Sequence, residues 1–282
     1  MKKHLFILSI IVLACGCNKP IDLDLPAYSS KIVINGEANT DTVFNFQVSR
    51  SLPIMQSNDS TGYLLQDATV TVYDGSALLG NAQYQGGKYV LNQKPLPEHT
   101  YTVNVSAKNY TTAQSIFSIP KKLNITTSYI DSIGTDNTGF KVGQITVSFS
   151  DEPNVKNYYR LLILAYDDGT LTWSPFNFTS NDVVFLNNTK LNDGSYIFSD
   201  RTFAGRTKTL TFSVPFGTAI GTPKFEVSIK TFSEDYYNYL RQTDQYNQNG
   251  NGVTNDPIIL KTNVTNGLGM IGGVSNARDT IQ

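Results

Sequence analysis

Apolar and polar residues alternate in short runs along most of this 282-residue chain, and this alternation limits what the chain can fold into. Residues 43–49 and 225–232 repeat with a period of two, which places one set of side chains on a buried sheet face. Asp74 and Gly75 lie between two apolar runs and are typical of a tight hairpin turn. The pattern predicts a mainly β protein.

Turn residues divide the alternation into two consecutive groups, with a boundary near Pro120. About seven short strands fall within residues 31–120, which predicts an immunoglobulin-like or transthyretin-like β-sandwich. Residues 121–282 are predicted to form a second β-rich domain, also a sandwich. Its residues 158–166 are so continuously apolar that we expect them at the centre of a sheet.

The second unit is predicted to contain one short helix near the C-terminus. Ser233 suits the capping position, and Glu234 and Asp235 suit the positive end of the helix dipole. Residues 183–185 are predicted as a weak strand. The glycine-rich residues 266–273 do not have the spacing of a phosphate-binding loop.

The start of the chain predicts export and lipid attachment. Lys2 and Lys3 precede an apolar run at residues 5–13, which is too short to cross a bilayer and is typical of a signal peptide. Small residues directly before a cysteine at the end of such a run resemble a bacterial lipobox. We therefore predict a signal peptide at residues 1–16, then a lipidated cysteine and tether at residues 17–30.

Cys17 is the favoured lipidation site, because the h-region should end before the cleavage site and polar Asn18 follows Cys17. Cys15 is the alternative, since residues 12–14 before it also fit a lipobox. A palmitoylated cysteine would hold the protein at the membrane. No cysteine follows position 17, so the mature chain has no disulfide and no thiol nucleophile.

The charge of the chain excludes one class of partner. Removing Lys2 and Lys3 from the 22 basic residues leaves 20 against 23 acidic residues, a formal charge of −3. A chain with this charge and no basic run lacks the electrostatic pattern of a nucleic-acid-binding protein.

Candidate catalytic and metal-binding residues are few. His99 is the only histidine after the leader, and one histidine without cysteine cannot build the usual zinc site. The adjacent pairs Asp151-Glu152 and Asp167-Asp168 are candidate glycosidase carboxylates or calcium ligands, although aspartate is also common in turns. We expect no cofactor, no metal and no enzymatic activity, with a carboxylate-based envelope hydrolase as the enzymatic alternative.

Aromatic residues are the better candidates for binding. Most of the 16 Tyr and 15 Phe must fill the cores of the sandwiches. Trp173, Phe176 and Phe178, however, lie in a segment that reads as a loop or sheet edge. Exposed aromatic rings stack on sugars or anchor protein partners, so these three residues are the predicted contacts for a glycan or peptide ligand.

A short motif of Asp, then Ser or Thr, then an aliphatic residue or Thr occurs four times. Its hydroxyl residues are Thr42, Ser60, Ser132 and Thr280. The motif resembles the acceptor sequence for O-glycosylation in Bacteroidetes-type bacteria. The alternative is that all four hydroxyls belong to ordinary turns.

Several short segments, taken in order, resemble one protein family. The chain is similar to the Bacteroidetes-type lipoproteins of domain of unknown function 4249 over nearly the whole mature sequence. The matching segments are residues 17–26, 31–36, 68–70, 157–160, 232–240 and 263–272. The chain departs from the family pattern at Met270-Ile271, where an aromatic residue is more typical.

The resemblance implies a location and a partner but no chemistry. The members of this family have no assigned activity and look like envelope lipoproteins often encoded beside TonB-dependent outer-membrane receptors. We therefore expect a non-enzymatic, lipid-anchored outer-membrane protein that assists a TonB-dependent β-barrel transporter in nutrient binding or uptake. We expect it at the cell surface, with the periplasmic face as the alternative. A stand-alone surface adhesin or glycan-binding module is the other hypothesis.

Overall fold

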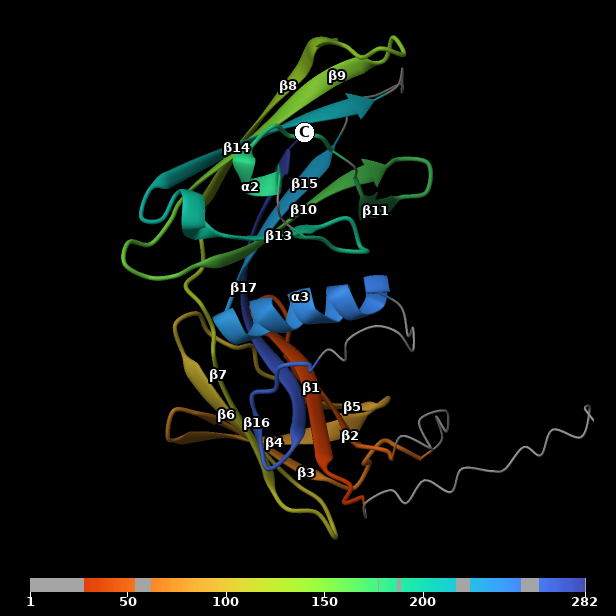
Figure 1. Cartoon of the computed structure of the whole chain (residues 1–282), viewed down its shortest axis with the longest axis vertical. Helices are drawn as coiled ribbons and strands as arrows, with labels where there is room; N and C mark the ends of the chain where they lie inside the picture. The colour runs from red at the N-terminus through yellow and green to blue at the C-terminus, as the bar shows by residue number, and fades with distance from the viewer. Residues whose placement is uncertain are drawn as a thin grey trace, which may run out of the picture.

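The computed structural model describes residues 28–53, 62–176, 178–186, 189–216, 224–249 and 259–281. Within this part of the chain strands predominate and the sheets are arranged as sandwiches, which confirms the predicted mainly β class. Figure 1 shows two β units stacked along the long axis, with helix α3 (Glu234–Asn249) lying across the waist between them.

The first unit is formed by part of a 14-stranded sheet, in the strand order β1-β2-β5-β4-β3-β6-β7-β16. Its inward positions alternate as the sequence predicts: Ile32, Ile34, Phe44 and Phe46 are fully buried. The strands are β1 (Ile32–Asn39), β2 (Phe44–Arg50), β3 (Thr69–Asp74), β4 (Ala77–Gln85), β5 (Lys88–Leu91), β6 (Thr100–Ser106), β7 (Ala113–Ser118) and β16 (Val264–Thr265).

The second unit packs two sheets against each other around a separate hydrophobic core. One sheet has the order β12-β13-β10-β15-β17, so the apolar strand at residues 158–167 is central, as predicted. These strands are β10 (Tyr158–Asp167), β12 (Thr189–Lys190), β13 (Tyr196–Ser199), β15 (Phe225–Phe232) and β17 (Leu268–Ile281). A further short strand, β11 (Thr172–Pro175), pairs with β10. The facing sheet consists of β8 (Ile125–Thr135), β9 (Lys141–Ser150) and β14 (Thr207–Phe216).

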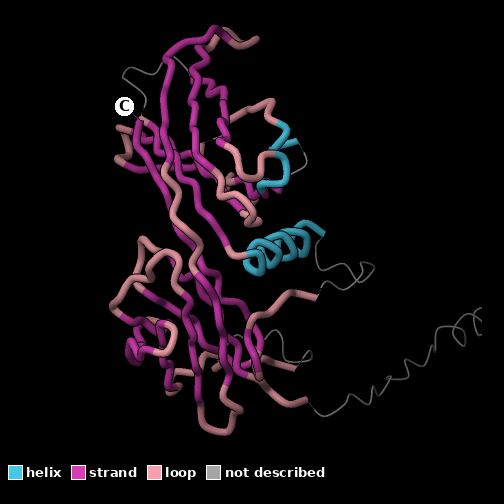
Figure 2. The backbone as a smooth tube through the Cα atoms, turned by 90° about the vertical axis from the view of Figure 1, so that its left-hand side faces the viewer, coloured by secondary structure: helices cyan, strands magenta, loops and turns pink. Residues whose placement is uncertain are grey.

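Strand β17 belongs to both units. Its first half runs parallel to β1, from Leu268 opposite Val33 to Val274 opposite Asn39. Its second half pairs antiparallel with β15, as far as Ile281 opposite Phe225. Figure 2 shows this strand passing the waist while α3 lies to one side. The C-terminal segment therefore completes the core of the first unit, to which Val264 and Ile271 contribute.

The glycine-rich segment allows β17 to pass through this crowded waist. A Cβ on Gly272 would lie 2.3 Å from the ring of Tyr236, and one on Gly273 would lie 1.9 Å from the Ser118 carbonyl oxygen. Real Cβ atoms do not approach other atoms so closely, so only glycine fits at these two positions. The glycines therefore serve close packing of α3 and β7 on β17.

An ionic network ties the two units together beneath α3. Lys230 of β15 donates to Glu37 of β1 over 2.7 Å, and the Tyr236 hydroxyl of α3 donates to Glu37 over 3.1 Å. Burial opposes ionisation of Glu37, but Lys230 and the donors from Asn39 and Tyr236 outweigh it and hold the pKa of Glu37 below its usual value. Burial and the Glu37 charge raise the pKa of Tyr236. The carboxylate is therefore ionised near neutral pH.

One predicted strand is wrong. Residues 183–185 belong to a short helix, α2 (Val183–Leu186), rather than to a strand. Asp182 accepts a hydrogen bond from the Val184 backbone N–H over 2.9 Å, which satisfies a free donor of the first turn. The helix also packs Phe185 against Phe198 and Phe212, so tertiary contacts outweigh the strand preference of valine and phenylalanine.

The helices of the described residues do not have the length and hydrophobicity that a membrane-spanning helix requires.

Candidate functional site

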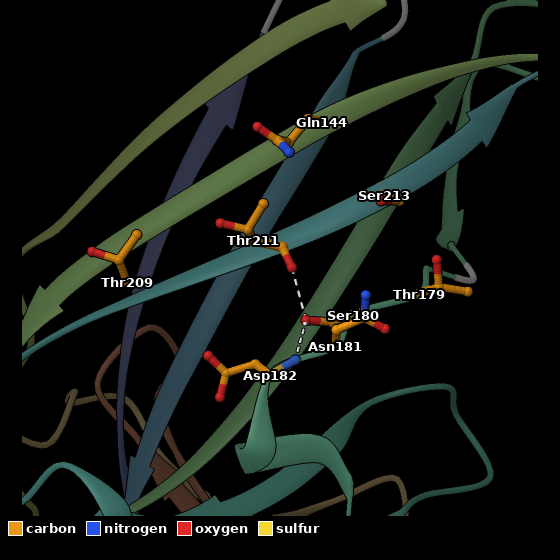
Figure 3. Close-up of a pocket in the computed structure, with 8 residues that line it drawn as sticks. All are labelled: Gln144, Thr179, Ser180, Asn181, Asp182, Thr209, Thr211 and Ser213. Atoms are coloured by element: carbon orange, nitrogen blue, oxygen red, sulfur yellow. Dashed lines mark hydrogen bonds between the residues drawn. The ribbon is translucent and has the colours of Figure 1, made fainter. Parts of the chain in front are cut away.

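A polar cleft on the outer face of the second unit is the candidate binding site. It encloses about 280 Å³ and opens over β9 and β14 (Figure 3). Its lining is polar at every position: Gln144, Thr179, Ser180, Asn181, Asp182, Thr209, Thr211 and Ser213. We refer to it as the hydroxyl cleft.

The alternation of β14 creates the floor of the hydroxyl cleft. Leu210 and Phe212 point into the core and are fully buried, so Thr209, Thr211 and Ser213 between them point outward. A strand has this two-residue period, which is why one strand can serve the core and the surface together.

A crossing segment at residues 179–182 forms the wall of the cleft. Thr179 pairs with Ser213 as an isolated bridge, and the Ser180 hydroxyl donates to the Thr211 carbonyl over 2.7 Å. Figure 3 shows the Ser180 hydroxyl between the Thr211 carbonyl oxygen and the Asp182 backbone nitrogen. The segment is fixed at its start by Phe178, which is buried against Phe212 with the ring centroids 4.7 Å apart.

The hydroxyl cleft lies at the edge of a wider face covered by hydroxyl groups. The β-pairing register aligns Thr126, Ser148 and Thr209 in one row across three strands. The next row holds Ser128, Thr146 and Thr211. The Ser148 and Thr209 hydroxyl oxygens are 2.9 Å apart. The face therefore offers neutral donors and acceptors in a regular array.

The cleft carries mostly neutral polar groups. Its only titratable side chain is Asp182, whose carboxylate accepts hydrogen bonds from Lys208 over 2.7 and 2.9 Å. The Lys208 contact therefore neutralises the one acidic side chain among the described residues of the lining. Hydroxyl and amide groups bind neutral ligands that carry many hydroxyl groups of their own.

The three aromatic residues predicted to bind ligand lie in different surroundings. Trp173 is 39% exposed at the edge strand β11, where it packs on Tyr166 with ring centroids 5.1 Å apart. Phe176 is half-buried and packs edge-on against Phe225. Phe178 is buried in the core, so its position supports the wall of the cleft rather than direct contact with ligand. Of the three, Trp173 is accessible as a platform.

Three of the four carboxylates considered for catalysis bond to other groups of the chain, and Asp151 and Glu152 also line a cavity of about 400 Å³. Asp151 is buried and accepts hydrogen bonds from the Tyr159 hydroxyl and, over 2.6 Å, from the Gly205 backbone N–H. Burial and the Asp151 contact raise the pKa of Tyr159. Asp167 accepts from the Gly169 backbone N–H in an exposed turn, and this bond lowers the pKa of Asp167. Asp168 contacts Lys224 over 3.3 Å.

His99 lies in the predicted turn before β6. Its Nδ1 is 2.7 Å from the Asp74 carboxylate, and its ring stacks on Tyr101. Within the residues that the structure describes, no group of three or more His, Cys, Asp and Glu side chains is placed to hold a metal ion.

The candidate glycosylation residues Thr42, Ser132 and Thr280 are all exposed. Ser60 lies outside the described residues, as do Cys15 and Cys17. The residues that form the hydroxyl cleft were not predicted from the sequence. A signal for them exists in residues 207–214, where Thr and Ser alternate strictly with large apolar residues after position 208.

Comparison with known proteins identifies a family. The chain matches the model of a domain of unknown function, DUF4249, over residues 18–280. The chain belongs to this family. No curated protein matches it.

Solved structures of other proteins resemble this DUF4249 chain only weakly. A Salmonella alpha-2-macroglobulin variant has 11% sequence identity and a TM-score of 0.23, with 78% of this chain covering 15% of the other. The full-length major pilin SpaD from Corynebacterium diphtheriae has 10% identity and a TM-score of 0.21, with 74% of this chain covering 62% of the pilin. The chain thus spans less than two thirds of either protein.

Proposed function

We propose that this DUF4249 protein is a lipid-anchored outer-membrane binding protein without enzymatic activity, which assists a TonB-dependent transporter in nutrient capture. The lipobox at Cys17 supports the anchor. The link to a transporter rests on the resemblance to lipoproteins encoded beside such receptors. The hydroxyl cleft supplies a surface for a neutral, hydroxyl-rich nutrient such as a glycan.

The observation that carries this proposal is the position of β1, the strand that follows the predicted tether. Strand β1 begins at the end of the first unit that is farthest from the second unit (Figure 1). Eleven residue steps separate Tyr28 from Cys17 and can span at most about 40 Å. An anchor at Cys17 would therefore keep the first unit within reach of the membrane.

The anchor can be tested by metabolic labelling with palmitate. The wild-type chain and a Cys15→Ala variant should incorporate label and remain with the outer membrane. A Cys17→Ala variant should lose both label and membrane association. Label retained in Cys17→Ala and lost in Cys15→Ala would assign the anchor to Cys15. If neither the wild type nor the variants incorporate label, the proposed lipid anchor is wrong.

The transporter partner can be tested by cross-linking in intact cells, followed by purification of the lipoprotein in detergent. A TonB-dependent β-barrel should be recovered with the wild-type chain. Cross-linked samples without any barrel would contradict the accessory role. Protease treatment of intact cells distinguishes the proposed cell-surface location, in which the chain is cleaved, from the periplasmic face, in which it is protected.

A stand-alone glycan-binding adhesin is the second candidate, because the hydroxyl cleft and the exposed Trp173 support glycan binding without a transporter. Retained glycan binding in cells that lack every cross-linked barrel partner would favour this candidate. The carboxylate-hydrolase hypothesis gains no support from Asp151, which is buried by its contacts with Tyr159 and Gly205.

We also propose that Thr42, Ser60, Ser132 and Thr280 carry O-linked glycans. The intact mass of the mature protein should exceed that of the lipidated polypeptide, and replacing all four residues by alanine should remove the excess. A wild-type mass equal to lipid plus bare polypeptide would contradict the modification.

A further inference from the structure

A second cavity lies where α3 meets the base of the second unit. It encloses about 400 Å³ and is lined by Val183 and Val184 of α2, Ser199 of β13, Arg201 and Thr202 of the short helix η2 (Asp200–Thr202), and Tyr237 and Arg241 of α3. Two arginines from different elements thus face one cavity. The described residues that line it include no carboxylate. We call it the arginine pocket.

Two other arginines of the described chain are neutralised by acidic side chains. Arg160 pairs with Asp193, and Arg278 pairs with Asp41. Among the described residues, no ion pair joins Arg201 or Arg241 to an acidic side chain. Two guanidinium groups beside one cavity repel each other unless an anion lies between them.

Arg241 packs against Tyr237, its neighbour one helical turn earlier on α3. Its guanidinium lies over the Tyr237 ring, 5.8 Å from the centroid. Tyr237 is buried, and burial raises the pKa of its hydroxyl while Arg241 opposes that rise. Cation–π packing of this kind pre-orients a guanidinium, so that its N–H donors can bind a ligand at smaller entropic cost.

The rest of the arginine pocket is suited to the carbon body of a ligand. The valine side chains of α2 and the ring of Tyr237 form an apolar wall, while Ser199 and Thr202 add neutral polar groups. A planar carboxylate matches the planar fork of arginine. We propose that the arginine pocket binds a small organic carboxylate, with the carboxylate at Arg201 and Arg241 and the carbon body against Val183 and Tyr237.

This proposal does not depend on membrane anchoring or on the hydroxyl cleft. It is tested by isothermal titration of the full chain in detergent with benzoate, and with benzamide as the neutral analogue of the same shape. The wild-type protein should bind benzoate and should bind benzamide at least tenfold more weakly. Arg201→Gln and Arg241→Gln should each weaken benzoate binding by about tenfold or more, because each removes a charge-assisted hydrogen bond to the carboxylate.

Lys88→Gln is the matched control, because it removes one positive charge from an exposed position on β5 in the first unit. It should leave benzoate binding unchanged, and all variants should keep the wild-type melting temperature. Equal loss in Lys88→Gln, or undiminished binding in both arginine variants, would overturn the proposal. Binding of inorganic phosphate without binding of benzoate would overturn the assignment to a carboxylate.

Discussion

The two units of the molecule use the same strand alternation for different purposes. In the first unit, β1 and β2 bury Ile32, Ile34, Phe44 and Phe46 in the hydrophobic core. In the second unit, β14 buries Leu210 and Phe212 while its outward residues form the hydroxyl cleft. The arginine pocket also lies at the second unit. This difference agrees with the proposed function, in which the first unit is a support and the second unit the binding module.

Removing Phe178 tests most strongly whether the wall of the hydroxyl cleft depends on the core of the second unit. Phe178→Ala should lower the free energy of unfolding by about 3–5 kcal/mol, because it leaves a cavity beside Phe212. Urea unfolding measures this loss. The exposed Trp173→Ala is the matched aromatic control, and an equal loss in both variants would contradict the contrast between wall and surface.

Gly272→Ala tests whether the two units are joined through β17. The added methyl group would collide with the Tyr236 ring, so we expect a loss of about 2 kcal/mol in unfolding free energy. Gly169→Ala, in an exposed turn, is the control and should change stability by less than about 0.5 kcal/mol. Unchanged stability of Gly272→Ala would show that α3 does not pack on β17 as described.

Glu37 tests the ionic contact between the units. Its pKa is lowered in the folded state, so its contribution to stability is present above its ordinary pKa of 4.5 and is lost as the pH falls through the folded value. We expect a contribution of about 1 kcal/mol at pH 7. Stability of the wild type and of Glu37→Gln, measured from pH 7 to pH 3, should converge at low pH. A constant difference across this range would contradict the ionic role.

Trp173→Ala should have the smallest effect on stability, below about 0.5 kcal/mol, because the side chain lies at an exposed sheet edge. The Trp173→Ala variant therefore measures the contribution of this ring to ligand binding without a large change in stability. If Trp173 is a stacking platform, glycan binding should fall by about fivefold or more while the melting temperature stays constant. Unchanged binding would restrict the site to the hydroxyl cleft.

The first unit could be predicted from the sequence better than the second. Period-two runs such as residues 43–49 place their apolar side chains inward without help from distant contacts. Strand β17 could not be predicted, because Gly269, Gly272 and Gly273 weaken any local strand preference. Its conformation is set by β1 and β15, which are remote in sequence.

The candidate site was harder to predict than the fold. Phe178 was predicted to contact ligand because it is an aromatic residue near a sheet edge. Such a ring can point toward solvent or into the core, and the Phe178 ring is buried in the core. Thr209 and Thr211 are ordinary strand residues, and only the approach of residues 179–182 makes them part of a cleft. Arg201 and Arg241 lie 40 positions apart and meet only in the folded chain.

Glycan binding by the full chain in detergent, with Thr209→Val compared against Thr100→Val, tests the central claim most directly. Both threonines lie on exposed strand positions, and each contacts a serine hydroxyl across the strand pair, over 2.9 Å at Ser148 and 2.8 Å at Ser118. An array of neutral glycans should bind the wild type and Thr100→Val equally, and Thr209→Val about fivefold more weakly, as expected for one lost hydrogen bond. Equal binding by both variants, or loss only in Thr100→Val, would contradict the assignment of binding to the second unit.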